Sequence, residues 1–499
     1  MTAPPASPGA RLAHALRDRL QRRAGSAVEM IETHLSWILL ARHLAIKLKK
    51  PVRLPFVDYG DVEARRRCCV EELRVNRRFA PGIYRAVLAV RGTADAPRFG
   101  GAGDAIDHVV CMRRFPADAL LSERIAVGLD PAAMSRFARR LSAIHADSHV
   151  AAPHRAGASP EQAIRAVTAQ LRPLQRDACS EWMNRWTDDQ AGALRDRWQA
   201  RRVRGRVREC HGDLHLGNLV MLDGEIVAFD AIDFDPALRW IDVMSDVAFL
   251  AMDLEARGRR DLAFAFVDDY LQAGGDYDGV SVLRFYATYR ALVRQLAASL
   301  APSAHGPDYR AAAHRWATGS APRLVLMCGL SGSGKSSVAR QLVQAAGAIR
   351  IRSDVERKRR ADPADAAYSE AATRRTYARL ARAVRPALAA GFPVIVDAAF
   401  LRAGHRRHFR TIARRLGVPF EILHCEAGDA VSRGRLEARE RAGLDPSEAT
   451  EATWLRQKNW AEPLSARESA VTTRISGESA QIAAIVARWH AQGPAATAA

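Results

Sequence analysis

The sequence predicts two folded domains, an α+β domain of two lobes followed by an α/β domain built on a parallel sheet. Three observations lead to this. At 499 residues the chain is too long for one ordinary core. The polar loop HGDLHLGN at residues 211–218 precedes a hairpin that ends in two further carboxylates, Asp230 and Asp233. An apolar strand, a GxxxxGKS loop and a helix start occur together at residues 323–339.

The composition is that of a folded protein, with 48% hydrophobic and 26% charged residues and no apolar run of about 18 residues. Seven cysteines without a CxxC pair argue against a zinc site and against a secreted disulfide framework. We therefore expect a cytoplasmic protein with no membrane partner. Residues 1–25 lack the apolar core of a signal peptide, and we expect them, like residues 491–499, to be a flexible tail. The net charge of +20 fits nucleic-acid binding, but the arginines are spread throughout the chain.

The small lobe begins with a predicted β-hairpin whose second arm spans residues 44–50. Alternation along that strand places Lys47 and Lys49 on one face. The whole chain has only six lysines, so a lysine is more likely to lie where a compact ammonium group is needed. A strand lysine near the start of such a lobe is typical of a phosphate-binding residue, and we assign that role to Lys47. A charged, protected edge strand is the alternative.

A helix is predicted over residues 58–79, and one of its glutamates is expected to pair with the strand lysine, Glu72 being favoured over Glu71. A solvated charged face is the alternative. Strands at residues 84–90 and 108–115, around a glycine-rich loop, complete the lobe. Helical patterns follow from about residue 117 up to the polar loop.

The polar loop has the spacing of a phosphoryl-transfer site. Asp213 is predicted to accept the proton of an attacking hydroxyl, and Asn218 to bind magnesium from one side. Either Asp230 or Asp233 binds it from the other side. Turn-capping residues without catalytic function are the alternative. Asp246, later in the chain, is expected to brace the loop, as a carboxylate does in kinase-like large lobes, with a solvated helix acid as the alternative.

The GxxxxGKS loop predicts a second phosphate-binding site. Lys335 is expected to reach the β and γ oxygens, and Ser336 and Asp397 to hold magnesium. Asp354 is expected to act as the acceptor's base, and Arg357 to hold an anionic group. A basic helix carrying Arg435 and Arg439 is expected to close over ATP, with a solvated helix as the alternative. The predicted ATP-binding residues are Gly329, Leu330, Ser331, Gly332, Ser333, Gly334, Lys335, Ser336, Ser337, Arg435 and Arg439.

With these motifs, residues 28–300 resemble the aminoglycoside phosphotransferase-like kinases, relatives of the choline kinases. Residues 322–490 resemble the P-loop nucleotide and polynucleotide kinases, zeta-toxin kinases included. Their order resembles a bacterial family that fuses the two. The resemblance implies a protein-kinase-like bilobal domain, a P-loop NTPase domain, ATP and Mg²⁺. The chain departs from the first pattern in its spread acids (FDAIDF at 229–234) and in having no clear glycine-rich nucleotide loop in the small lobe.

The expected organisation is a kinase domain at 26–300, a linker or terminal helix at 301–321 and a P-loop domain at 322–490. We expect an ATP- and Mg²⁺-dependent phosphotransferase that phosphorylates a small-molecule hydroxyl in the first domain and binds or hydrolyses ATP, or transfers phosphate, in the second. A 5′-hydroxyl polynucleotide or nucleotide kinase, with nucleic acid as partner, and an ATP-driven regulatory module are the alternatives. The sequence leaves the acceptors and the oligomeric state open.

Overall fold

A computed structural model describes residues 7–54, 57–152, 159–172, 178–300, 306–319, 321–359, 369–443, 447–476 and 478–492. The chain forms two compact units. The first comprises Met1–Ala133, Ile144–Ser159 and Arg204–Asp246, and the second comprises Met134–Ala143, Pro160–Val203 and Val247–Ala499.

The first unit begins with helix α1 (Pro8–Ala24), which is capped by the Ser7 side chain. Its residues Leu12, Leu16 and Leu20 are buried in a core cluster with Trp37 and Val109 of the small-lobe sheet. The expectation of a flexible tail over residues 1–25 is therefore wrong from residue 8 onward. The reason is the four-residue spacing of those leucines, which gives an apolar helix face that the sheet covers.

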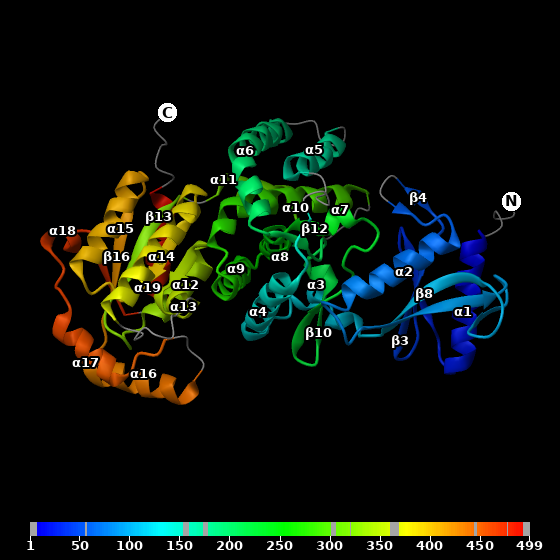
Figure 1. The fold of residues 1–499 in the computed structure, drawn as a ribbon, viewed down its shortest axis with the longest axis horizontal. Helices are drawn as coiled ribbons and strands as arrows, with labels where there is room; N and C mark the ends of the chain where they lie inside the picture. Colours follow the sequence, from blue (N-terminus) through cyan, green and yellow to red (C-terminus); the bar gives the residue numbers. More distant parts are fainter. Residues whose placement is uncertain are drawn as a thin grey trace. The chain divides into compact units, whose positions relative to one another are not determined.

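A six-stranded antiparallel sheet follows, in the order β1-β2-β3-β8-β6-β7. Helix α2 (Val62–Asn76) packs against β8 and β6 (Figure 1). It is shorter at both ends than predicted. It begins at Val62 because the Asp61 side chain caps its N-terminus. The strands are β1 (Glu29–Glu32), β2 (Ser36–Leu40), β3 (Leu44–Lys49), β6 (Tyr84–Gly92), β7 (Pro97–Phe99) and β8 (Ala105–Arg113). Two short strands between β3 and α2, β4 (Arg53–Leu54) and β5 (Val57–Asp58), pair with each other.

The rest of the first unit carries the polar loop. The loop leads into the hairpin of β10 (Leu219–Leu222) and β11 (Glu225–Ala228). Asp223 and Gly224 both have positive φ, 51° and 79°, which is the backbone of a tight two-residue hairpin turn. The other elements are α3 (Leu121–Arg124), the ends of α4 (Pro131–Asp147), β9 (Val207–Glu209), α7 (Pro236–Arg239), β12 (Trp240–Asp242) and the start of α8 (Val243–Ala256).

The second unit combines helices with a parallel sheet. Helix α11 packs on α10, and Tyr309 Oη donates a hydrogen bond of 2.7 Å to Asp253. Residues 309–318 of the segment expected as linker or terminal helix are thus a packed helix, because Asp308 caps it and its apolar face is covered. Residues 301–305 and 320 lie outside the described residues. The helices are α5 (Pro160–Leu171), α6 (Ala178–Val203), most of α8, α9 (Arg260–Gly274), α10 (Val280–Leu300) and α11 (Tyr309–Thr318). No helix among the described residues is long and apolar enough to cross a membrane.

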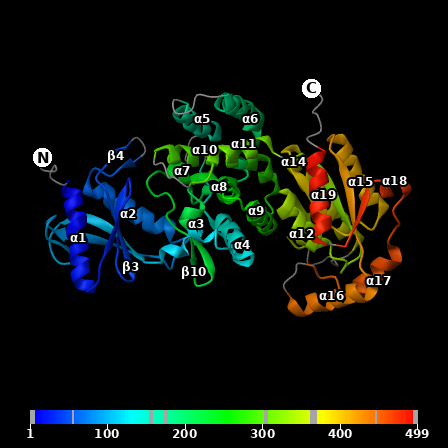
Figure 2. The same cartoon turned by 180° about the vertical axis from the view of Figure 1, so that it is seen from behind.

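The parallel sheet has the order β14-β15-β13-β16-β17. Helices α12 and α19 lie side by side on one face (Figure 2), and α14 and α15 contact strands on the other. This confirms the predicted α/β domain. Its elements are β13 (Arg323–Cys328), α12 (Lys335–Ala346), β14 (Ile349–Arg352), α13 (Ser353–Arg359), α14 (Glu370–Ala389), β15 (Pro393–Asp397), α15 (Ala403–Arg415), β16 (Phe420–Cys425), α16 (Asp429–Ala442), α17 (Glu451–Trp460), α18 (Ala466–Ser469), β17 (Thr472–Ile475) and α19 (Ser479–Ala491). Residues 493–499 of the expected second tail lie outside the described residues.

Candidate functional site

Two predicted residues of the polar loop meet directly. The Asn218 side chain donates hydrogen bonds of 2.9 Å to both the backbone oxygen and Oδ2 of Asp213. A single helical turn at Leu216–Asn218, capped by His215, brings the amide back toward the carboxylate. Asn218 is buried, whereas the Asp213 side chain is 37% exposed. A substrate hydroxyl can therefore reach the carboxylate.

Asp246 fixes the start of the polar loop through its backbone, as the sequence predicted. Its carboxylate accepts hydrogen bonds from the backbone N–H groups of His211 (2.7 Å) and Gly212 (2.9 Å), and it is completely buried. The His211 ring lies 2.9 Å from the carbonyl of Phe229, at the end of the hairpin. Burial lowers the pKa of His211, so the ring is neutral near pH 7 and joins the loop to the end of the hairpin as an uncharged group. Gly212 has φ of 85°, and a Cβ there would meet the Leu238 carbonyl oxygen at 2.7 Å.

A buried cluster of charges lies between strand β3, helix α2 and the segment after β11. Lys47 Nζ is 3.0 Å from Glu72 and 2.6 Å from Asp230. Lys49 Nζ is 2.7 Å from the other oxygen of Glu72 and 2.6 Å from Asp233. The predictions that the two lysines share a face and that Glu72, not Glu71, is their partner are confirmed.

The two acids after the hairpin differ in exposure. The Asp230 side chain is 46% exposed, while that of Asp233 is 6% exposed. Burial raises the pKa of Asp233 even though Lys49 opposes that effect. The backbone N–H of Phe229 donates to the Asn218 carbonyl, 3.0 Å, so Asp230 follows directly after a residue bonded to the polar loop. Asp230 is therefore better placed than Asp233 to present an oxygen to a metal beside Asn218.

The two lysines differ in the same way. The Lys47 side chain is 13% exposed and that of Lys49 only 1%. Burial lowers the pKa of each lysine, but the carboxylates facing them outweigh it and raise both values. Burial likewise opposes ionisation of Glu72, yet Lys47 and Lys49 lower its pKa to about 2. All three groups are thus charged at neutral pH, and Lys47 is the lysine that a ligand can reach.

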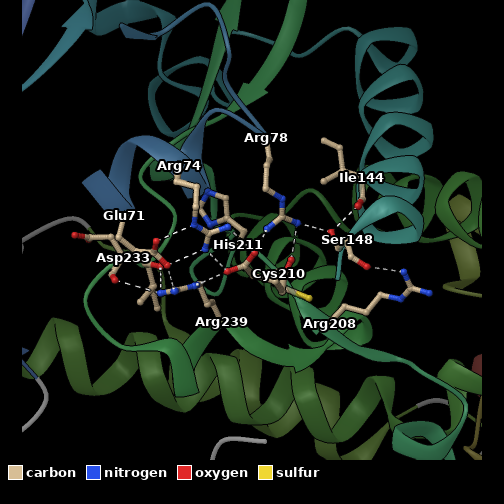
Figure 3. A network of polar contacts seen from close by, with 12 residues as sticks. Glu71, Arg74, Arg78, Ile144, Ser148, Arg208, Cys210, His211, Asp233 and Arg239 are labelled. Atoms are coloured by element: carbon tan, nitrogen blue, oxygen red, sulfur yellow. Dashed lines mark hydrogen bonds and ion pairs between the residues drawn. The ribbon is translucent and has the colours of Figure 1, made fainter. Parts of the chain in front are cut away.

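Sequence reasoning missed a further buried acid, Glu209 at the end of β9. Three arginines contact it: Arg74 at 2.5 Å, Arg78 at 2.9 Å and Arg239 at 3.1 Å. Figure 3 shows these three side chains converging beside Cys210 and His211. Burial opposes ionisation of Glu209, but the arginines lower its pKa to about 2. Arg74 lies in the last turn of α2, Arg78 lies two residues beyond its end, and only Cys210 separates Glu209 from the polar loop. This network therefore ties the Glu72 helix to the loop.

In the second unit, the GxxxxGKS loop joins β13 to α12 as predicted. Gly329, Gly332 and Gly334 have φ of 136°, 81° and 92°. A Cβ at Gly329 would meet the Cys425 carbonyl oxygen at 2.3 Å, and one at Gly332 the Ser432 carbonyl oxygen at 2.6 Å, so the loop packs closely on neighbouring backbone. Lys335 Nζ folds back over the loop and donates to the Leu330 carbonyl, 2.7 Å.

A cavity of about 440 Å³ opens over this loop. It brings together the side chains of the predicted acceptor end, Asp354 and Arg357, with those of the predicted lid, Arg435 and Arg439. Of the predicted loop residues, Gly329, Leu330 and Ser333 do not line the cavity. The other six do: Ser331, Gly332, Gly334, Lys335, Ser336 and Ser337. Gln457 of α17, which sequence reasoning missed, lines it as well and accepts the Ser331 N–H at 2.9 Å.

Asp397 lies at the end of β15 within this cavity. It is buried, and its Oδ2 has no hydrogen-bond partner among the described residues. The nearest cationic atoms are Arg352 Nε at 3.4 Å and Arg350 Nη1 at 3.8 Å. A buried carboxylate oxygen with no hydrogen bond, in the same cavity as the Ser336 hydroxyl, fits the ligand set that Mg²⁺ prefers. Burial lowers the pKa of Lys335, and Asp397 partly offsets the effect.

The acceptor-side pair is already formed. Arg357 Nη2 is 2.7 Å from Asp354 Oδ1, one helical turn away on α13. Of the lid arginines, Arg435 donates to the Gly332 carbonyl at 3.3 Å and Arg439 to the Ala449 carbonyl at 2.7 Å.

Comparisons with known proteins agree with both folds. Residues 101–287 match the model of the phosphotransferase enzyme family, and residues 324–464 match that of the AAA domain. Uncharacterized proteins of Mycobacterium tuberculosis and Mycobacterium bovis are 28% identical over 490 residues, which covers 87% of this chain and 91% of theirs.

Two solved structures are similar to separate parts of the chain. A choline/ethanolamine kinase family protein from Mesorhizobium loti is 15% identical, with a TM-score of 0.39, covering 62% of this chain and 92% of its own. Kti12 from Chaetomium thermophilum, in complex with ADP-AlF3, is 19% identical, with a TM-score of 0.29, covering 33% and 96%. The chain therefore carries a segment that matches the phosphotransferase enzyme family, followed by a segment with a P-loop that matches the AAA domain.

Proposed function

We propose that this protein is an ATP- and Mg²⁺-dependent phosphotransferase with two nucleotide sites, the first of which phosphorylates a hydroxyl group of a small molecule. The observation that carries the proposal is the pairing of Asp213 with Asn218 on a braced loop, in the same unit as the Lys47, Glu72 and Asp230 cluster. These are the residue types that a kinase needs for a base, a metal and a phosphate.

In the first site Asp213 accepts the proton of the substrate hydroxyl as the hydroxyl oxygen bonds to the γ-phosphorus of ATP, the bond from that phosphorus to ADP breaks, and ADP leaves. The bond between Asn218 and Asp213 Oδ2 fixes the direction of the carboxylate. Magnesium, when bound, neutralises charge on the phosphates; Asn218 and Asp230 are the residues that would hold it. Lys47, oriented by Glu72, supplies a positive charge to the phosphates of ATP. Asp233, paired with Lys49, fixes the cluster from behind.

In the second site the phosphates of ATP lie on the loop ahead of α12, where Lys335 and Ser336 line the cavity. Asp397 and Ser336 would hold its magnesium. Asp354 and Arg357, in the same cavity, are placed to meet an acceptor, with Asp354 as its base. An ATP-driven regulatory module without an acceptor would not need Asp354, so ATP hydrolysis that is unchanged in Asp354→Ala would favour that function.

A nucleotide or a 5′-hydroxyl polynucleotide is the second candidate acceptor, and one observation favours it for the second site. Arg357, Arg435, Arg439 and Arg456 all line the cavity, as does Trp460, on whose ring Arg402 lies 5.1 Å from the centroid. Arginines beside an exposed aromatic ring suit a phosphorylated, base-bearing ligand. The cytoplasmic location expected from the sequence belongs to this proposal too.

The test is a screen for ATP consumption over hydroxylated metabolites, sugars and 5′-hydroxyl oligonucleotides, with Asp213→Ala and Lys335→Ala in parallel. Loss of a general base typically costs a hundred- to ten-thousandfold in rate, so Asp213→Ala should lower first-site turnover by at least about a hundredfold while ATP still binds. Asp223→Ala is the matched control, because Asp223 lies at the exposed tip of the neighbouring hairpin. Turnover in Asp213→Ala that equals that of Asp223→Ala would refute the proposal.

A further inference from the structure

Helix α9 lies within the segment that matches the phosphotransferase family, yet its side chains and backbone hold three elements of the P-loop domain. On β14, Arg350 forms a two-pronged ion pair with Asp268, at 3.3 Å and 2.6 Å. At the end of α13, Arg359 donates to the carbonyls of Gln272 and Ala273 at the C-terminus of α9. On α12, Arg340 lies 3.8 Å from Asp269.

Among these contacts, the ion pair of Arg350 reaches the second nucleotide site directly. Its Nη1 atom donates to the Ser336 carbonyl, 3.2 Å away, and lies 3.8 Å from Asp397 Oδ2. Ser336 and Asp397 are the two residues that would hold magnesium there. Arg350 and Asp268 are both buried, so neither charge is solvated by water.

The distances show which carboxylate holds the guanidinium. At 2.6 Å the contact with Asp268 is a charge-assisted hydrogen bond, whereas 3.8 Å to Asp397 is too long for one. A buried guanidinium that loses its carboxylate partner must find another, because an unpaired buried charge is strongly unfavourable. Of the described carboxylates that contact Arg350, Asp397 is the one that would remain.

We propose that Asp268 is a positioning residue of the P-loop site, which holds Arg350 away from Asp397 and so keeps a carboxylate oxygen available for Mg²⁺. This inference rests on the proposed nucleotide binding at the second site. It assigns to the phosphotransferase-family segment a role in the metal affinity of the other domain.

The test measures Mg²⁺ dependence in the full-length protein. Binding of a fluorescent ATP analogue is titrated with Mg²⁺, and the part of the signal that Lys335→Ala removes is assigned to the P-loop site. In Asp268→Asn we expect that part to need about tenfold more Mg²⁺ for half-saturation, while binding without Mg²⁺ changes by less than about twofold.

Asp276→Asn is the matched control. Asp276 forms the same kind of buried two-pronged pair with Arg201, at 2.9 Å and 2.8 Å, in the same compact unit, and it is not among the residues that line the cavity. General loosening of the unit would affect both variants, so an equal change in Mg²⁺ requirement in Asp276→Asn, or none in Asp268→Asn, would overturn the inference.

A double variant separates positioning from support of the fold. If Arg350 competes with Mg²⁺ for Asp397, Asp268→Asn/Arg350→Gln should return the Mg²⁺ requirement to within about twofold of the parent, because the competing cation is gone. A requirement at or above that of the single variant would contradict the mechanism. If Lys335→Ala removes no signal even in the parent, the proposed second nucleotide site fails, and this inference fails with it.

Discussion

The two lysines of β3 lie in one charge cluster, but replacing each by methionine should affect a different property, stability for one and turnover for the other. Lys49 is buried against Glu72 and Asp233, whereas Lys47 contacts Glu72 and the half-exposed Asp230. Methionine keeps much of the side-chain volume and removes the charge. We expect Lys49→Met to loosen the fold and Lys47→Met to abolish first-site turnover with little loss of stability.

The magnitudes follow from what each change leaves behind. Without Lys49, the Asp233 carboxylate is buried with no cation within 4 Å among the described residues, and breaking a buried pair costs about 3–5 kcal/mol. Without Lys47, Glu72 keeps Lys49 at 2.7 Å and water can solvate Asp230, so about 1 kcal/mol is expected. Since 1.4 kcal/mol is a factor of ten, the two variants should differ by at least about twentyfold in local opening.

Hydrogen exchange followed by mass spectrometry measures this opening in peptides from β3 and α2, where the cluster is held. ATP turnover that depends on Asp213 is measured on the same samples. Lys50→Met serves as the control, because Lys50 contacts the exposed Glu32 and the Trp37 ring and not the carboxylates of the cluster. Equal protection of β3 and α2 in Lys49→Met and Lys50→Met would refute the reasoning. So would full turnover in Lys47→Met.

Two further predictions concern the acids. Asp230→Asn should abolish Asp213-dependent turnover and its response to Mg²⁺, whereas Asp233→Asn should retain that response and lose stability; Mg²⁺ titrations of turnover separate the two, and the reverse pattern would assign the metal to Asp233. Glu209 has an ordinary pKa of 4.5 and a folded value of about 2, so its stabilisation is complete above about pH 4.5 and is lost as the pH falls toward 2. The midpoint temperature of thermal unfolding should therefore fall more steeply over that pH range in the parent than in Glu209→Gln, which should already be destabilised at pH 7. Parallel curves of midpoint temperature against pH would count against the network.

The parts of the site that were predictable depend on short sequence spacings. Asp213 and Asn218 are five residues apart in a polar loop, and Lys47 and Lys49 alternate along one strand, so local geometry alone brings each pair together. The GxxxxGKS loop between a strand and a helix carries its own context. These patterns also predicted the two fold classes, because the hairpin and the strand–loop–helix unit are each continuous in sequence.

The parts that were not predictable depend on long-range pairing. Asp233 is occupied by an ion pair with Lys49, which lies 184 residues before it, while the Asp230 side chain stays half-exposed. Glu209 meets Arg74 and Arg78 from more than a hundred residues away. No local pattern marks such partners, because an arginine or a glutamate on a helix reads equally well as a solvated charge. Helix α1 was a different failure, since its leucine spacing was visible but was assigned to a tail.

The contact between Gln457 and the Ser331 N–H has a consequence for nucleotide entry. A phosphate oxygen that accepts this N–H takes the place of the glutamine oxygen, so one hydrogen bond is exchanged for another with little net change. The same exchange removes one hydrogen bond between α17 and the loop. In the proposed ATP complex, the helix that carries Arg456 and Trp460 is therefore held to the loop by one hydrogen bond fewer.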